Sequence, residues 1–279
     1  MNVAPLEFVI ILFVVSISAG LLGSLVGLGG GVVIVPVLTL VFHIDIRLAI
    51  GASIVAVIAT SSGAAASYVK DRMTNLRAGM FLEIATSTGA ICGAFLTTYL
   101  PVRFLFILFA CVLTYSGLAM YSKREEAELL TTSRDALANS FKLHGSYVDK
   151  ASGELISYKV TNTKLGLLLM YIAGMISALL GIGSGALKVP AMDLAMHIPL
   201  KASSATSNFM IGVTAAASAG VYFARGDIDP ILAAPIALGV LVGALVGSRL
   251  LGRLDSKYVK LLFIMAIAMV AVEMFAKGI

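Results

Sequence analysis

The chain has 279 residues, of which 59% are hydrophobic and 13% charged, and its mean hydropathy is +1.00. Soluble domains carry roughly 45–50% apolar and 25% charged residues, so this composition excludes an ordinary soluble protein and indicates an integral membrane protein. The net charge of +5 does not indicate nucleic-acid binding, because the basic residues lie in loops between apolar stretches, where they report membrane topology.

Eight apolar stretches approach the roughly 20 residues that a helix needs to cross the hydrocarbon core. They run over 6–26, 48–69, 77–99, 104–121, 165–180, 203–224, 231–248 and 258–276. Helices are expected because a membrane β-barrel would alternate apolar and polar residues. No basic residue precedes the first stretch, so it is taken as a membrane span and not as a signal peptide. Cys92 and Cys111 lie inside these stretches and are expected to be buried packing thiols.

Two shorter apolar segments, 32–42 and 186–196, each follow a glycine cluster. The clusters are Gly27-Leu-Gly-Gly-Gly31 and Gly181-Ile-Gly-Ser-Gly185. As a helix, each short segment would be about 16 Å long, which is enough to cross half of a bilayer.

An internal repeat relates these two regions at an offset of 154 residues, without a gap. The offset pairs His43 with His197, Ser53 with Ser207, Thr60 with Thr214, Tyr68 with Tyr222, and Gly89, Ala90 and Gly93 with Gly243, Ala244 and Gly247. In an apolar chain, two halves interrupted by glycine at corresponding positions are typical of secondary transporters, whose binding site forms where the halves meet.

The charge distribution predicts how the halves are oriented. If each short segment turns back to the side from which it came, each half has five segments and the repeats are inverted; otherwise each half has four and the repeats are parallel. The five-segment arrangement places 15 Lys and Arg on one face and 4 on the other, against 12 and 7 for the four-segment arrangement. The positive-inside rule therefore favours inverted repeats, with both termini outside and the loop 122–164 in the cytoplasm.

The predicted organisation is a first transmembrane repeat over 1–121, the cytoplasmic loop over 122–164 and a second repeat over 165–279. In the loop, residues 123–138 are charged and helix-forming, and residues 142–161 alternate around a central turn, which predicts a β-hairpin. The expected fold is all-α, with four full spans and one half-helix in each repeat and a small cytoplasmic hairpin.

The glycine clusters are the first candidate binding site. A helix loses roughly 0.8–1.0 kcal/mol for each glycine relative to alanine, and a break in hydrocarbon is tolerated only where it is buried in protein or lines a cavity. The free N–H groups at the start of a short helix would suit an anion. The residues predicted to bind it are Gly29, Gly30, Gly31, Gly183, Ser184 and Gly185. Close helix packing is the alternative, and it is the interpretation we adopt for Gly89, Gly93, Gly239, Gly243 and Gly247.

Lys188 occupies the position that Ile34 has in the first repeat. A lysine at this depth costs roughly 2.5–3.5 kcal/mol on insertion scales, so we expect it to be a counter-charge for an anionic substrate, with internal pairing as the alternative. Ser53, Ser207 and Asn208 are predicted to donate hydrogen bonds to the anion; their alternative role is to satisfy carbonyls of their own helix.

Candidates for proton or ion coupling are Glu83, Asp193, His43 and His197, although the two histidines are first read as structural residues at the membrane edge. No paired carboxylates, metal-ligand cluster, nucleophile–base spacing or cofactor motif is found, which argues against an enzyme.

Several motifs resemble the sulfite exporter TauE/SafE family of membrane transporters over nearly the whole chain. They are Gly27-x-Gly29-Gly30-Gly31 through Val35-Pro36, Ala49-x-Gly51-x-Ser53, Gly181-x-Gly183-x-Gly185 through Val189-Pro190, and Ala202-x-x-Ala205-Thr206-Ser207. The resemblance implies export or uptake of sulfur-containing anions such as sulfite, sulfonates or sulfoacetate in a prokaryotic inner membrane. The insert at 122–164, Ser184 and Lys188 depart from the pattern.

The expected function is secondary transport of a small organic or inorganic sulfur-containing anion, by alternating access around a site at the membrane midplane and without a cofactor. The expected partners are that anion, a coupling proton or ion, the lipid bilayer and a second copy of the chain in a homo-oligomer. Two alternatives stay open: an anion channel on the same scaffold, and a receptor or scaffold that acts through the hairpin.

Overall fold

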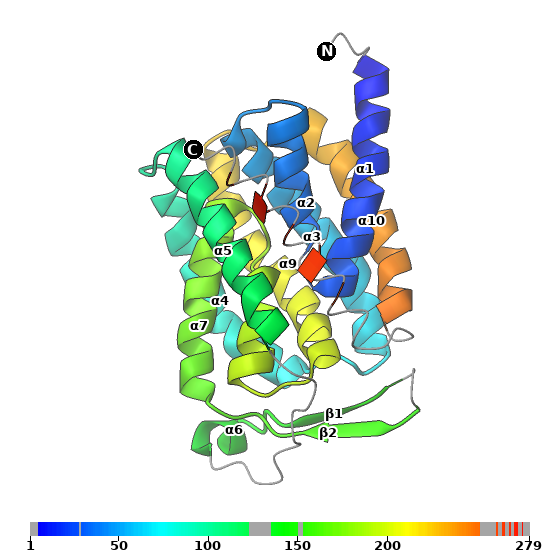
Figure 1. Cartoon of the computed structure of the whole chain (residues 1–279), viewed down its shortest axis with the longest axis vertical. Coiled ribbons are helices and arrows are strands. Elements are labelled where there is room, and N and C mark those ends of the chain that lie inside the picture. Colours follow the sequence, from blue (N-terminus) through cyan, green and yellow to red (C-terminus); the bar gives the residue numbers. More distant parts are fainter. Residues whose placement is uncertain are drawn as a thin grey trace.

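The computed structural model describes residues 5–27, 29–122, 135–149 and 153–251, with scattered helical positions between 261 and 275. Its long helices run beside one another (Figure 1) and are α1 (Pro5–Val26), α3 (Ile46–Lys70), α4 (Leu76–Leu96), α5 (Val102–Ser122), α7 (Thr163–Leu180), α9 (Leu200–Ala224) and α10 (Pro230–Leu251). The first seven predicted spans are therefore confirmed as helices, and the eighth, 258–276, falls largely outside the described residues.

Five of these helices, α1, α3, α4, α7 and α10, are long and apolar enough to cross a membrane. The 25-residue helix α9 is long enough but more polar, because it carries a series of buried hydroxyl and amide side chains. These side chains are Ser203, Ser204, Thr206, Ser207, Asn208, Thr214 and Ser218.

Each glycine cluster is followed by a short helix that continues as a π-helical turn. Helix α2 (Gly31–Pro36) runs into η1 (Val37–Val41), and α8 (Gly185–Pro190) runs into η2 (Ala191–Ala195). The wider turn begins directly after the proline, which lacks an N–H donor and whose ring crowds the carbonyl one turn earlier. The structure thus confirms the two predicted half-helices.

His43 and His197 end these half-helices in the same way. Both adopt a left-handed backbone, with φ of 56° and 57°. The N–H of the following residue donates to a carbonyl six positions back, from Ile44 to Leu38 and from Ile198 to Met192, both at 2.9 Å. This end resembles a Schellman motif, whose bond spans five positions, widened by one residue after the π-helical turn.

Both half-helices return the chain to the side from which it came. The ring of Phe42, directly after η1, lies 5.1 Å from the ring of Phe8 near the start of α1. In the second half, the N–H of Thr161, just before α7, donates to the carbonyl of Met196 after η2 at 3.2 Å. A crossing segment would have ended at the far end of the preceding helix, so both short segments turn back and the repeats are inverted. The first half has five segments, and the described part of the second half has the four that correspond to the first four of them.

The two repeats exchange one helix each. Helix α4 of the first half packs against α7 and α9, while α10 of the second half packs against α1 and α3. A Cβ added at Gly89 would overlap the carbonyl oxygen of Tyr171 on α7, and one at Gly243 would overlap that of Ile17 on α1. These glycines are therefore close packing positions, as predicted. We call α1, α2, α3 and α10 the N-bundle, and α4, α7, α8 and α9 the C-bundle.

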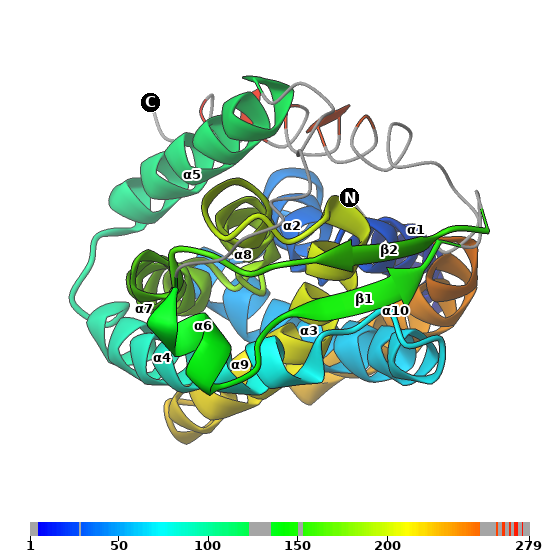
Figure 2. The same cartoon turned by 90° about the horizontal axis from the view of Figure 1, so that it is seen from below.

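The insert between the repeats covers one end of the molecule. It contains α6 (Ala136–Ser140) and the antiparallel strands β1 (Gly145–Val148) and β2 (Leu155–Tyr158). The strands lie across the helix ends, opposite the start of α1 (Figures 1 and 2). The predicted hairpin is confirmed, whereas most of the helix predicted over 123–138 falls outside the described residues.

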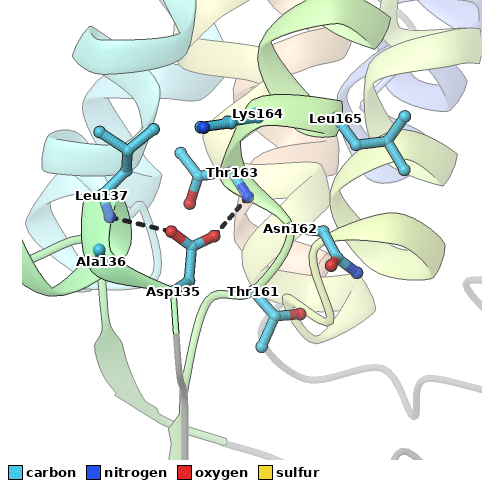
Figure 3. A pocket seen from close by; sticks show the side chains of 8 residues that line it. All are labelled: Asp135, Ala136, Leu137, Thr161, Asn162, Thr163, Lys164 and Leu165. Carbon is cyan, nitrogen blue, oxygen red and sulfur yellow. Dashed lines mark hydrogen bonds between the residues drawn. The ribbon is translucent and has the colours of Figure 1, made fainter.

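Two hydrogen-bonded anchors hold the insert in place. The carboxylate of Asp135 accepts from the N–H of Leu137 at 3.0 Å and from that of Thr163 at 2.6 Å, which ties α6 to the first turn of α7 (Figure 3). The ammonium group of the buried Lys201, at the start of α9, lies 2.6 Å from the carboxylate of Asp149 at the end of β1.

The cysteine prediction is wrong: Cys92 and Cys111 are both exposed. In a membrane protein the outward helix faces contact lipid, so an apolar sequence context does not distinguish a buried thiol from a lipid-facing one.

Candidate functional site

The two glycine breaks lie against each other where the N-bundle meets the C-bundle. The hydroxyl of Ser53 donates to the carbonyl of Gly181 at 2.6 Å, and its repeat equivalent, Ser207, donates to the carbonyl of Gly27 at 2.9 Å. A Cβ added at Gly31 would stand 2.5 Å from the same carbonyl of Gly181. The structure thus brings both breaks together through a reciprocal pair of hydrogen bonds.

The backbone of each break needs glycine because it is left-handed at several positions. Gly29 and Gly30 have φ of 81° and 71°, and Gly183 has φ of 77°. A side chain is tolerated at Ser184, where φ is 58°, and its hydroxyl donates to the carbonyl of Gly183 at 2.7 Å. This hydroxyl is therefore turned onto its own backbone.

The start of α8 has unused donors. Among the described residues, the backbone N–H groups of Gly185 and Ala186 donate no hydrogen bond to another backbone group. Leu187 and Lys188, the next two residues, both donate to the carbonyl of Ser184, at 3.0 and 2.8 Å. The two free groups belong to the first turn of the helix, which has no intrahelical partners and attracts negative charge.

Three predicted anion ligands join the halves in this structure. Ser53 and Ser207 make the reciprocal bonds to glycine carbonyls, and the amide nitrogen of Asn208 donates to the carbonyls of Ser24 at 2.8 Å and Ser204 at 3.0 Å. The amide oxygen of Asn208 is buried without a hydrogen-bond partner. Donation from these side chains to a substrate would require the bonds between the halves to open.

Lys188 is paired inside the protein. Its ammonium nitrogen lies 2.6 Å from the Thr214 hydroxyl and 3.5 Å from Oε2 of Glu83, and its side chain is 0% exposed. Glu83 Oε1 accepts from Thr214 at 2.6 Å and from Ser87 at 2.8 Å, while Oε2 is buried with no hydrogen bond. The internal pairing considered for Lys188 is thus observed, with α4 supplying the carboxylate.

Glu83 is therefore the predicted coupling residue that contacts Lys188. His197 lies instead at the hairpin end, where its Nδ1 is 2.7 Å from the Thr161 hydroxyl. Asp193 is buried in η2, with 6% of its surface exposed. Thr214, which bridges the pair, was not among the predicted binding or coupling residues. The repeat offset, which pairs it with Thr60, was the signal in the sequence that could have identified it.

The predicted binding residues are enclosed in the described part of the protein. All ten residues predicted to bind substrate are buried. A cavity of about 350 Å³ lies between α5, α7 and α8, and its lining includes Leu187 and Pro190, but it is apolar and does not include the breaks. A second cavity, of about 740 Å³, is lined by residues of the insert and the start of α7 (Figure 3). Neither of these two cavities includes the glycine breaks in its lining.

Comparison with known proteins agrees with this architecture. The sequence profile of the family described as sulfite exporter TauE/SafE matches residues 12–274. The chain is 26% identical to the probable membrane transporter protein YunE of Bacillus subtilis over 277 residues, covering 97% of this chain and 98% of that protein. It is 23% identical to the probable membrane transporter protein YdhB of the same organism over 242 residues, covering 86% and 88% of the two chains.

A probable membrane transporter protein of Methanocaldococcus jannaschii is 22% identical over 267 residues, covering 90% of each chain. No solved structure matches the chain. The profile covers nearly the whole sequence, and the described helices fit a multi-pass membrane protein. The chain therefore belongs to the sulfite exporter TauE/SafE family and is a membrane transporter.

Proposed function

We propose that the chain is a secondary transporter of a small sulfur-containing anion, such as sulfite, a sulfonate or sulfoacetate, which binds where the two glycine breaks meet. The observation that carries the proposal is the position of Lys188, three residues after the second break and fully buried. Unused N–H groups at the start of α8 lie on the same short helix, and both groups attract negative charge. The family description, sulfite exporter, supports the choice of anion.

Alternating access would move the N-bundle against the C-bundle. Because α4 and α10 are exchanged, the moving units would be these bundles and not the two halves of the sequence. The reciprocal bonds of Ser53 and Ser207 lie at the bundle interface and would break or re-form as the site opens. A rocking motion around a fixed central site is the usual mechanism of transporters with inverted repeats.

Flux into liposomes tests the proposal. Purified protein should give saturable uptake of labelled sulfite, methanesulfonate or sulfoacetate, and counterflow when unlabelled anion is preloaded. Gly29→Leu should abolish the flux, because φ is +81° and a Cβ would stand 3.0 Å from Ile211. Gly220→Leu is the matched control, since nothing lies within 4 Å of an added Cβ there. Unsaturable flux without counterflow would indicate the alternative, an anion channel; equal flux through wild type and Gly29→Leu would place the site elsewhere.

We further propose that the hairpin face is cytoplasmic and that both termini lie outside, in a prokaryotic inner membrane. Lys70, Arg72 and Arg77 lie in the loop between α3 and α4 and in the helix ends beside it. Asn75 of this loop donates to the carbonyl of Leu143, beside the hairpin, at 2.7 Å, so these basic residues lie at the hairpin end of the molecule. The basic loops therefore gather on the hairpin face, as the positive-inside rule requires of a cytoplasmic face.

Labelling of single cysteines checks this orientation. In a chain without its two native cysteines, Ser146→Cys in β1 should react with a membrane-impermeant maleimide only after the membrane is opened. Tyr99→Cys lies between α4 and α5 at a residue that is 83% exposed, and it should react in intact cells. The reverse pattern would invert the proposed orientation.

A further inference from the structure

We propose that Glu83 carries the proton of the transport cycle, and that in the empty site its carboxylate pairs with the ammonium group of Lys188 in place of the transported anion. The inference rests on the proposed function, because it specifies how the anion at the glycine breaks would be coupled to a proton.

The first observation is that the pair is incompletely bonded. Lys188 has three N–H donors and makes one hydrogen bond, to Thr214 at 2.6 Å. Its contact with Oε2 of Glu83 is 3.5 Å long, and that oxygen has no hydrogen-bond partner although the side chain is 9% exposed. A buried ionic contact is normally completed by hydrogen bonds on both partners. Lys188 therefore keeps donors for a second anion, and Oε2 keeps a lone pair for a proton.

The second observation is that, among the described residues, Lys188 and Glu83 are each other's charged neighbour within 4.0 Å. Helices α7, α8 and α9 pack with α4 in the C-bundle, and among their described residues Lys188 is the charged group that lies within 4.0 Å of Glu83. Ser87 and Thr214 supply neutral hydrogen bonds to Oε1. An uncompensated charge at this depth is costly, so any event that removes one partner must be accompanied by another that restores neutrality.

These observations give a balanced exchange. An incoming monovalent anion takes the ammonium group of Lys188, and the contact between Lys188 and Glu83 separates. A hydronium ion from the solvent on the open side donates a proton: one of its O–H bonds breaks, an O–H bond forms on Oε2 of Glu83, and a neutral water molecule is left. Release of the anion on the other side reverses both steps: the proton leaves Oε2 to water, and the carboxylate returns to Lys188. The site stays neutral throughout, and one proton travels with each monovalent anion.

The internal repeat fixes the stoichiometry. The positions equivalent to Lys188 and Glu83 in the other half hold Ile34 and Ala237, so the N-bundle has no counterpart of the pair. Lys188 on α8 and Glu83 on α4 both belong to the C-bundle. The pair would therefore move as part of one bundle and be presented to each side of the membrane in turn.

Calorimetric titration with methanesulfonate tests the exchange, because this anion stays ionised and any pH dependence belongs to the protein. Titrations in buffers of different ionisation enthalpy count the protons taken up by the full-length protein in detergent. The wild type should take up about one proton per anion bound, and Glu83→Gln should bind the anion with no proton uptake. Lys188→Met should not bind it. Equal proton uptake by the wild type and Glu83→Gln, or unchanged binding by Lys188→Met, would overturn the proposal.

Infrared spectroscopy provides a second test of the proposal, and this test needs no substrate. Lys188→Met removes the counter-charge, so a carboxylic acid band should appear that the double variant Lys188→Met/Glu83→Gln lacks. Absence of this band overturns the proposal whatever the anion. Saturable anion flux without proton uptake would leave the proposed function standing and reject this coupling. A band without binding of any tested anion would instead reject the proposed function and, with it, the anion step of the exchange.

Discussion

The buried pair of Lys188 and Glu83 makes a prediction in which the other half of the chain supplies the control. Lys188→Ile and Glu83→Ala each introduce the residue found at the equivalent position of the other repeat, Ile34 and Ala237. Each single change leaves one ionisable group without its partner in a site where Lys188 is 0% and Glu83 is 7% exposed. Breaking a buried ion pair in this way costs about 3–5 kcal/mol.

Glu83→Ala should be the more costly single change, because it also removes the acceptor for Thr214 and Ser87, and each lost hydrogen bond adds about 1 kcal/mol. The double variant contains no orphaned charge and should lie within about 1–2 kcal/mol of the wild type, because replacing a buried pair by apolar residues is often neutral. The free energy of coupling between the two positions should therefore be roughly 3 kcal/mol or more.

Equilibrium unfolding in mixed detergent micelles, followed by helical circular dichroism, measures all four proteins, and fluorescence is less suitable because the chain has no tryptophan. The double variant should be folded but should not bind anion. Two single variants that each lose less than about 1 kcal/mol and add in the double variant would refute the reasoning, because they would show a pair that is neither desolvated nor coupled.

Three further predictions concern helix packing, the hydrogen bond of Ser53 between the two halves, and the insert. Gly243→Ala should lower the midpoint of thermal unfolding strongly because its Cβ overlaps a carbonyl oxygen of α1, whereas Gly220→Ala, with open space around it, should leave it equal or raise it; equal effects would contradict the helix contact. Ser53→Ala should lower the free energy of unfolding by about 1 kcal/mol, because it loses its hydrogen bond to the other half. Ser62→Ala is the control, since the Ser62 hydroxyl bonds within its own helix; equal losses for the two variants would show that the bond between the halves does not stabilise the fold. Burial opposes ionisation of Asp135, but its hydrogen bonds from backbone N–H groups outweigh burial and lower its pKa. The contribution of this carboxylate to stability is therefore present above the usual aspartate pKa of about 3.9 and is lost only as pH falls through the lower native value; Asp135→Asn should speed amide exchange at the start of α7 at neutral pH, and unchanged exchange would show that the anchor is idle.

The sequence alone determined the elements and their order. Apolar length predicted the spans, because hydrocarbon thickness sets the length of a crossing helix. The glycine clusters and the prolines after them predicted the breaks and half-helices, since their effects on the backbone are local. The charge distribution predicted the inverted arrangement that the contacts of Phe42 with Phe8 and of Met196 with Thr161 confirm. The repeat offset identified Ser53 and Ser207 as equivalent residues.

Tertiary structure alone decided the partners of these residues. Nothing in the spacing of the chain links Glu83 to Lys188, and the exchange of α4 and α10 that brings them together depends on which helix faces fit closely. Ser53 and Ser207 were expected to face substrate, yet each bonds the terminal carbonyl of a helix in the other half. The physical reason is that helix ends leave unpaired carbonyls in a medium without water, and only the packed arrangement of both halves determines which hydroxyl reaches them.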